Sequence, residues 1–178
     1  LRASKNSCRN SITFPRAVGQ VPIYYNQKTT GRPPTDQKYT SKYLDSLVTP
    51  LYPFGYGLSY AQFRLSNLQL SARSINPSES VTASIDLENT SKRAGDEVVQ
   101  IYIHDLHASV TQPIKELRGF ERLTLQPGEK RRVNFKLTPD SLGMYNRDLK
   151  FVVEPGTFKV IVGTDSASGL EASFEVAH

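Results

Sequence analysis

The stretch Val81-Thr82-Ala83-Ser84-Ile85-Asp86-Leu87-Glu88 decides the fold class of this 178-residue chain. Its odd-numbered residues are apolar and its even-numbered residues are polar. Successive side chains of an extended strand point to opposite faces of a sheet, so strict alternation indicates a strand that is buried on one face. The stretch therefore predicts a β-strand that covers a hydrophobic core.

The same alternation recurs from residue 63 to the end of the chain. Its apolar members are Phe63, Leu65, Leu68 and Leu70; Val99, Ile101 and Ile103; Val133, Phe135 and Leu137; Phe158, Val160 and Val162; and Ala172, Phe174 and Val176. The first set slips near Asn67, which predicts a β-bulge. Seven or so short strands with almost no helical period predict an antiparallel β-sandwich over residues 63–178.

Two of the connections carry proline followed by glycine. They are Gln126-Pro127-Gly128-Glu129 and Glu154-Pro155-Gly156-Thr157. Proline presets the first central φ of a type II turn, and glycine accepts the positive second φ. Both stretches are therefore predicted to be type II turns between strands.

The stretch Pro53-Phe54-Gly55-Tyr56-Gly57-Leu58-Ser59-Tyr60 has a different character. It combines three aromatic rings with two glycines, which permit tight backbone turns. Rings of this size bury a large apolar surface and are poorly suited to a free linker in water. We interpret residues 51–62 as a linker packed at a seam between two structural units. The seam residues are Phe54, Gly55, Tyr56, Gly57 and Tyr60.

Residues 1–50 follow no single period. Six of the eleven prolines lie within the first 60 residues. Residues 12–14 and 21–25 are predicted to form short strands, and residues 43–48 one helical turn that stops before Pro50. A segment of this size cannot bury enough apolar surface for a core of its own. We interpret it as the tail of a domain that lies upstream.

Charge and composition exclude several classes of partner. The net charge is +5, but residues 1–60 hold eight lysines and arginines against two aspartates, and the later residues are nearly balanced. We expect no nucleic-acid partner, because a basic surface of this kind is either solvated or covered by a neighbour. No run of 18 apolar residues and no signal peptide is visible, so no membrane span is expected. Cys8 is the single cysteine, which excludes an internal disulfide framework but leaves the compartment open.

The seam, followed by Phe63, resembles a junction in glycoside hydrolase family 3 enzymes, the β-glucosidases and β-xylosidases. In that family it joins the second, α/β catalytic domain to a C-terminal fibronectin type III-like domain. Residues 13–26 resemble the closing strands of the α/β domain, and residues 30–33 the loop after them. Residues 113–120, 125–129 and 154–163 resemble the middle and end of the fibronectin-like domain. The first ten residues depart from the family pattern.

The resemblance implies a mainly β chain with an immunoglobulin or fibronectin type III-like sandwich over residues 63–178. Residues 1–50 would be the C-terminal remnant of the α/β catalytic domain. The amino-acid sequence of residues 19–33 resembles that of the bacterial periplasmic β-glucosidase type, which implies a periplasmic or secreted protein. The implied partners are the upstream catalytic domains and, through them, β-glucoside oligosaccharides. A homodimer is left open, and no cofactor is implied.

The family hydrolyses terminal β-D-glucosyl residues with retention, using an aspartate nucleophile and a glutamate acid/base. Two carboxyl groups must flank the scissile bond in such a reaction. The nucleophile lies in a Ser-Asp-Trp-type motif, yet this chain has no tryptophan, and residues 1–60 contain no glutamate. Neither role can be assigned to a residue here. The resemblance therefore implies an enzyme parent and a non-catalytic fragment.

Other candidate sites are weaker. His104, Asp105 and His107 are metal-ligand types, but a metal needs three or four converging ligands and no second cluster is apparent. Asp105 with Glu116 is one conceivable carboxylate pair, and Cys8 lacks a nucleophile motif. We therefore predict no metal site and no catalytic residue.

Two weak candidates for substrate binding remain in the loop of residues 31–43. They are Arg32 and Tyr39, which would border the sugar cleft of the intact enzyme. The alternative to an enzyme fragment is a free-standing module that binds carbohydrate or protein. Such a module requires exposed, coplanar aromatic rings, and the only tyrosines after Phe63 are Tyr102 and Tyr145.

Overall fold

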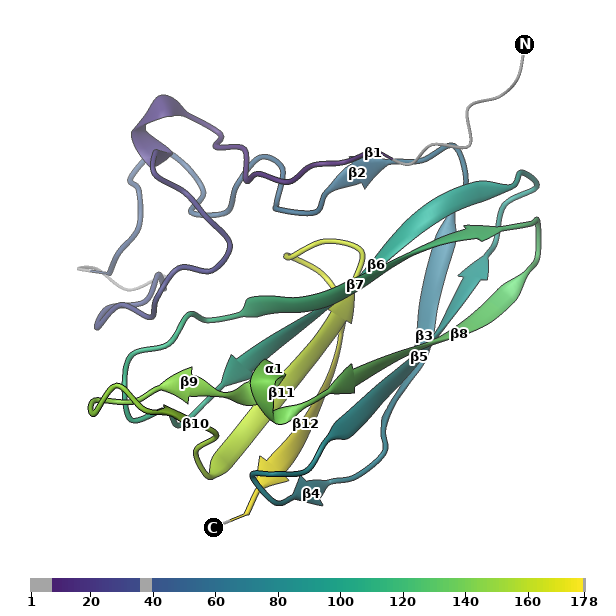
Figure 1. Ribbon diagram of the computed structural model, residues 1–178. Helices are drawn as coiled ribbons and strands as arrows, with labels where there is room; N and C mark the ends of the chain where they lie inside the picture. Colours follow the sequence, from purple (N-terminus) through teal and green to yellow (C-terminus); the bar gives the residue numbers. More distant parts are fainter. Residues whose placement is uncertain (1–7, 36–39, 178) are drawn as a thin grey trace.

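Two packed β-sheets form most of the molecule (Figure 1). The computed structural model describes residues 8–35 and 40–177. The five-stranded sheet has the order β4 (Ser74–Ile75), β12 (Leu170–Val176), β11 (Gly156–Gly163), β6 (Gly95–Asp105), β7 (Glu116–Leu125). The three-stranded sheet has the order β3 (Phe63–Leu70), β5 (Val81–Asn89), β8 (Lys130–Leu137). The predicted β-sandwich is confirmed, and the pairing is antiparallel except between β4 and β12.

The core lies between the sheets and is built from the alternating residues. Val81, Ala83, Ile85 and Leu87 of β5 are all fully buried. They pack in one cluster with the inward residues of the five-stranded sheet, among them Val99, Ile101, Phe158, Val160, Val162 and Phe174. The outward residues of β5 include Thr82, Ser84 and Glu88, which are only partly buried. Each strand thus contributes one apolar face, as the period of two predicts.

Local irregularities test the turn and bulge predictions separately. Asn67 has a φ of 55°, and the register of β3 against β5 shifts between Ser66 and Gln69, which confirms the bulge. Gly128 has a φ of 74°, and the amide of Glu129 donates to the carbonyl of Gln126 at 3.0 Å, as a type II turn requires.

The second predicted turn, over residues 154–157, is wrong. Gly156 has a φ of 152° and is the first residue of β11, where it pairs with Val176 of β12. The strand ladder extends the backbone at this glycine, so it cannot adopt the φ of about 80° that a type II turn needs.

Asp86 organises the outer face of the three-stranded sheet and should make the stability pH-dependent. Its carboxylate accepts from Asn67 at 2.8 Å and lies 3.1 Å from Lys130 and 3.4 Å from Arg132. The Asn67 hydrogen bond, followed by the Lys130 contact, lowers the Asp86 pKa. A lowered folded pKa contributes stability above the unfolded pKa, and this is lost as the pH falls through the folded value.

We expect Asp86→Asn to flatten the decline of unfolding free energy in acid and to lower that free energy at neutral pH. Urea unfolding between pH 2 and pH 7 measures both effects. The exposed Asp148→Asn is the matched control. An unchanged acid slope in Asp86→Asn would contradict the assignment.

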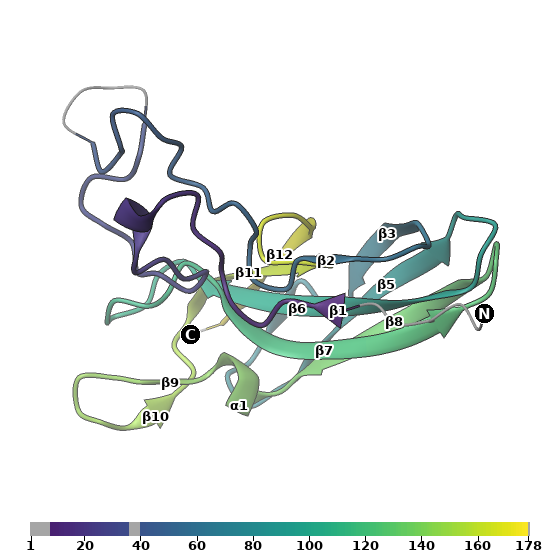
Figure 2. The ribbon, with the colours of Figure 1, turned by 90° about the horizontal axis from the view of Figure 1, so that it is seen from above.

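Residues 8–35 and 40–60 belong to an extended segment beside β6 and β7 that continues past one end of the sandwich (Figures 1 and 2). It contains β1 (Cys8–Arg9), which pairs antiparallel with β2 (Gly57–Leu58), and the short 3₁₀ helix η1 (Val18–Gln20). The strand predicted over residues 12–14 is reduced to one bridge between Phe14 and Tyr52. The predicted strand over 21–25 and the helical turn over 43–48 are both wrong.

A buried polar side chain next to residues 21–25 contacts the stretch 43–48. Gln20 is 3% exposed and accepts from the amide of Arg16 at 2.5 Å. It also donates to the carbonyl of Leu47 at 2.7 Å. Contacts between residues distant in the sequence, rather than a regular backbone ladder, order this part of the segment.

A small hairpin projects from the sandwich on the side opposite the segment (Figure 2). It follows α1 (Pro139–Leu142) and consists of β9 (Met144–Tyr145) and β10 (Phe151–Val152). Tyr145, Leu149 and Phe151 are exposed on it. Among the described residues, no helix has the length and apolar character needed to cross a membrane.

Candidate functional site

The aromatic-glycine seam lies against the outer face of β6. The ring of Phe54 stacks on Tyr25 with centroids 4.4 Å apart, and Tyr25 meets the edge of Tyr102 at 5.7 Å. Tyr102 is fully buried beneath these rings. Tyr56 stacks on Tyr52 at 5.0 Å, whereas Tyr60 is 82% exposed. A strand residue of the sandwich is therefore covered by rings from two separate parts of the segment.

Gly55 is the point at which the seam backbone comes closest to the sheet. Its φ is 79°, in the left-handed region that favours glycine. A Cβ at this position would lie 2.8 Å from Cδ of Gln100 and closer still to the atoms of the carboxamide. The glycine is thus required both by its backbone angle and by the approach of Gln100.

Gln100 satisfies polar groups from two loops at once. Its Nε2 donates to the carbonyl of Thr164 at 2.8 Å and to that of Gly55 at 3.5 Å. Its Oε1 accepts from the Tyr102 hydroxyl. The side chain is 3% exposed, so water does not compete for these bonds. The carboxamide ties the seam and the loop after β11 to the same strand.

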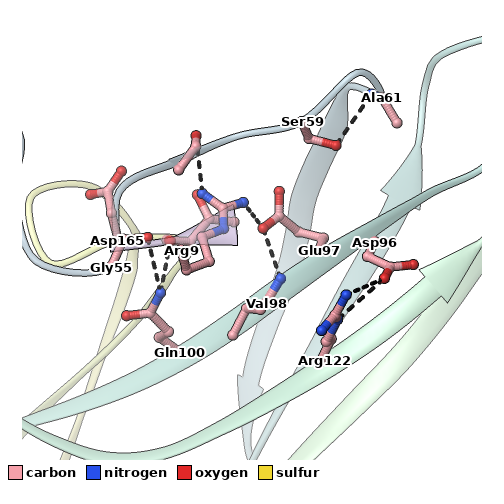
Figure 3. A network of polar contacts seen from close by, with 12 residues as sticks. Arg9, Gly55, Ser59, Ala61, Asp96, Glu97, Val98, Gln100, Arg122 and Asp165 are labelled. Carbon is pink, nitrogen blue, oxygen red and sulfur yellow. Dashed lines mark hydrogen bonds and ion pairs between the residues drawn. The ribbon is translucent and has the colours of Figure 1, made fainter. Parts of the chain in front are cut away.

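An ion pair joins Arg9, near the start of the described segment, to Glu97, near the start of β6. Arg9 pairs with Glu97 and donates to the carbonyl of Gly57 at 3.5 Å (Figure 3). Only 14% of the Arg9 side chain and 6% of the Glu97 side chain are exposed. Burial lowers the Arg9 pKa, while the nearby carboxylate of Asp165 acts to raise it. Nε of Arg9 is buried without a hydrogen-bond partner.

The other candidate residues do not assemble a catalytic site. Asp105 and Glu116 border one hollow of about 20 Å³, which holds no more than a water molecule. Glu116 also lies 2.5 Å from Arg118. A glycosidase needs room for a sugar between its two carboxyl groups, and this pair offers none.

His104 and Asp105 instead line an open hollow of about 370 Å³ beside residues 29–31. Burial lowers the pKa of His104 and raises that of Asp105. Within residues 8–35 and 40–177, no three side chains of His, Cys, Asp or Glu gather as metal ligands would. Arg32 is exposed, and Tyr39 lies outside the described residues.

Sequence reasoning located the rings of the seam but missed Arg9, Glu97 and Gln100. Arg9 lies in the stretch that departs from the family pattern, so no motif pointed to it. Gln100 occupies an outward position on a strand, where a polar residue ordinarily faces water. The one available signal was the pair of glycines at 55 and 57, which indicated a close backbone approach without naming the partner.

Comparison with known proteins agrees with this geometry. Residues 97–166 match the fibronectin type III-like domain. The chain is 46% identical over 168 residues to a periplasmic β-glucosidase of Salmonella typhimurium, covering 93% of this chain and 22% of that protein. It is 47% identical to a β-xylosidase of Formosa agariphila, covering 88% of this chain and 21% of the relative. The solved β-glucosidase of Listeria innocua in complex with glucose superposes with a TM-score of 0.89 at 42% identity, over 96% of this chain and 24% of that one.

The matches fall in the C-terminal portion of these proteins. The chain is homologous to that portion of glycoside hydrolase family 3 β-glucosidases. The resemblance inferred from the seam is confirmed. The chain spans about a fifth of the length of these curated relatives, and most of each β-glucosidase relative therefore has no counterpart here.

Proposed function

We propose that this chain is a non-catalytic part of a longer β-glucosidase, in which the sandwich supports the catalytic domains. The observation that carries the proposal is the uncovered apolar surface of the segment before β3. Its exposed members are Ile12, Phe14, Val18, Val21, Tyr24, Tyr43, Leu44, Leu47, Leu51, Tyr52, Leu58 and Tyr60. Val18 is 89% exposed and Leu44 fully exposed. A contiguous apolar surface of this kind is typical of an interface with another part of a protein rather than of a surface that faces water.

The proposed cover is the rest of the α/β domain to which this segment would belong. The domain division is part of the same proposal: a remnant over residues 1–50, a linker over 51–62 and the sandwich over 63–178. The contacts of Phe54 and Gly55 with the sandwich support a fixed seam. Tyr60 is exposed on this chain, and we propose that the missing domain covers it.

The longer protein would hydrolyse terminal β-D-glucosyl residues of oligosaccharides with retention. Its compartment would be the periplasm or the exterior, as the name of the Salmonella relative suggests. Arg32 and Tyr39 remain our candidates for the border of its sugar cleft. A homodimer is also proposed, supported by the exposed rings of the β9–β10 hairpin and tested by sedimentation of the longer protein.

We expect the 178-residue chain alone to release no product from a chromogenic aryl β-glucoside. The longer protein encoded by the same gene should hydrolyse the same substrate. Turnover that co-purifies with the isolated chain would refute its non-catalytic role. An inactive, folded longer protein that lacks a barrel with a Ser-Asp-Trp-type motif would refute the enzyme parent.

A free-standing carbohydrate-binding module is the competing function. It would need exposed, coplanar rings on the sandwich. Tyr102 is fully buried, and Tyr145 meets Phe151 edge-on at 65°. These rings form no flat platform for a sugar, which favours the supporting role. Binding of the isolated chain to insoluble glucans would reverse this preference.

A further inference from the structure

Apart from the Arg9–Glu97 ion pair, the sandwich contacts the segment before β3 at two further places. The first is the part of the seam at residues 53–56. The second lies where the loop between β6 and β7 meets residues 27–28. There the amide of Ile114 donates to the carbonyl of Gln27 at 2.9 Å, and Pro113 forms an isolated antiparallel bridge with Lys28. The two places are far apart along the chain on both sides of the contact.

Lys115 links these two places through the loop between β11 and β12. Its Nζ donates to the carbonyl of Ser166 at 2.6 Å. The amide of the same Ser166 donates to the carbonyl of Phe54 in the seam at 2.8 Å. Ser166 is 7% exposed, so both bonds are shielded from water. These hydrogen bonds, together with the peptide bond between Ile114 and Lys115, connect Gln27 through Ser166 to Phe54.

The loop in the middle of this path is held in one conformation by its own aspartate. Oδ1 of Asp165 accepts from the amides of Ala167 at 2.8 Å and Ser168 at 2.9 Å. Gln100 binds the preceding carbonyl, that of Thr164, from the side of the sheet. A loop fixed in this way can transmit a change at one end to the other, because it cannot absorb the change by bending.

The environment of Lys115 fits a structural role for its side chain. Burial lowers the pKa of the amine, and the carboxylates of Glu171 and Asp165 oppose that effect. Lys115 also lines a hollow of about 280 Å³ between the segment and the sandwich, together with Tyr24, Tyr25 and Val48.

We propose that Lys115 is a positioning residue that couples the two contacts, so that residues 27–28 and 53–56 dock on the sandwich as one unit. The segment would then be held in a single orientation by a clamp consisting of residues 113–115, 164–168 and Gln100. This inference concerns contacts within the chain, and it stands whether or not the longer protein is a glycosidase. In the proposed enzyme, the clamp would fix the orientation of the upstream domain.

The test is amide hydrogen exchange on the 178-residue chain, read at two remote reporters. The amide of Gly55 donates to Asn10 at 2.8 Å and reports on the seam. The amide of Ile114 reports on the contact with Gln27. In Lys115→Met, Gly55 should exchange about tenfold faster, since a bond to a charged donor is lost. Lys115→Arg keeps a donor and should restore protection.

Coupling between two sites is reciprocal, so weakening the seam must also weaken the contact between Ile114 and Gln27. Gln100→Leu removes the hydrogen bond from β6 to the carbonyl of Gly55 in the seam. The amide of Ile114 should then exchange about tenfold faster as well. Lys136→Met is the matched control, because Lys136 is an exposed lysine of β8, in the other sheet.

Three outcomes would overturn the proposal. In the first, Lys115→Met leaves Gly55 as protected as it is in Lys136→Met. In the second, Gln100→Leu leaves Ile114 unchanged, which would make the two contacts independent. In the third, the core amides of β5 accelerate by the same factor as the reporters, which would mean that the segment has no docking equilibrium separate from the sandwich.

Discussion

Phe158→Ala is expected to lower the free energy of unfolding of the sandwich by about 3–5 kcal/mol. Phe158 is 1% exposed, and its ring stacks on that of its cross-strand partner Phe174 at 5.6 Å and 15°. Truncation removes the buried ring and its contacts, and it leaves a cavity between two rigid sheets. Because domains are stable by roughly 5–15 kcal/mol, the loss is a large share of the total.

Urea or guanidinium unfolding followed by far-UV circular dichroism measures this loss. Phe120→Ala is the matched control, because Phe120 is 69% exposed on β7 and its removal opens no cavity. The control should change the unfolding free energy by no more than about 0.5 kcal/mol. Equal losses in the two variants would show that the β11–β12 pair does not lie in the core.

The sandwich could be predicted from the sequence because its rule is local. Most core strands, among them β5, β6, β8, β11 and β12, carry an apolar residue at every second position, and period two has one structural meaning. The bulge at Asn67 was visible because it breaks that period. The turn at Gly156 was mispredicted because Pro-Gly specifies a type II turn only where no strand partner extends the glycine. The partner strand, β12, is formed by residues 170–176. These residues lie outside the four-residue motif, so the motif gives no information about the pairing.

The segment before β3 could not be predicted because its order comes from contacts distant in sequence. Gln20 is held by Leu47, Tyr25 by Phe54 and Tyr102, and Arg9 by Glu97. None of these pairs has a spacing that marks it in advance. Residues 8–35 and 40–62 take their conformation from such pairs within the segment and from contacts with the outer face of β6. The glycines of the seam revealed a close approach, and only the fold identified Gln100 as the side chain approached.

The two outer faces of the sandwich differ in a way that supports the proposed orientation. On the three-stranded sheet, the outward residues form charged and polar pairs, such as Arg64 with Glu88 at 2.7 Å and Ser84 with Asn134 at 2.7 Å. On the five-stranded sheet, Gln100 and Tyr102 point outward yet are buried by the segment. The outer face of the three-stranded sheet pairs its own polar side chains and requires no covering domain. The outer face of the five-stranded sheet is already covered by the segment. The upstream domain is therefore expected on the side of the five-stranded sheet.

Glu97→Ala is expected to release the start of the segment from the sandwich. The substitution leaves the Arg9 guanidinium largely buried and without its ion pair, and breaking a buried pair costs about 3–5 kcal/mol. The pair holds β1, so the cost falls on the docking of residues 8–10 and 55–58 and not on the core. The amide of Asn10, which donates to the carbonyl of Tyr56 at 2.8 Å, should then exchange nearly as fast as in an undocked segment.

Glu88→Ala is the matched control, since it breaks a glutamate–arginine pair whose Arg64 side chain is 65% exposed. Exposed pairs contribute little because water screens them, and Asn10 should keep its protection in this variant. The double variant Arg9→Met/Glu97→Leu distinguishes two causes of weaker docking. One is the loss of the attraction between Arg9 and Glu97, and the other is the cost of a buried Arg9 charge that has lost its partner. An apolar pair of similar volume can replace a buried ion pair without loss, so the double variant should recover most of the docking that Glu97→Ala loses. If the double variant is as labile as Glu97→Ala, the segment depends on the ion pair itself, and the explanation by a stranded charge is wrong.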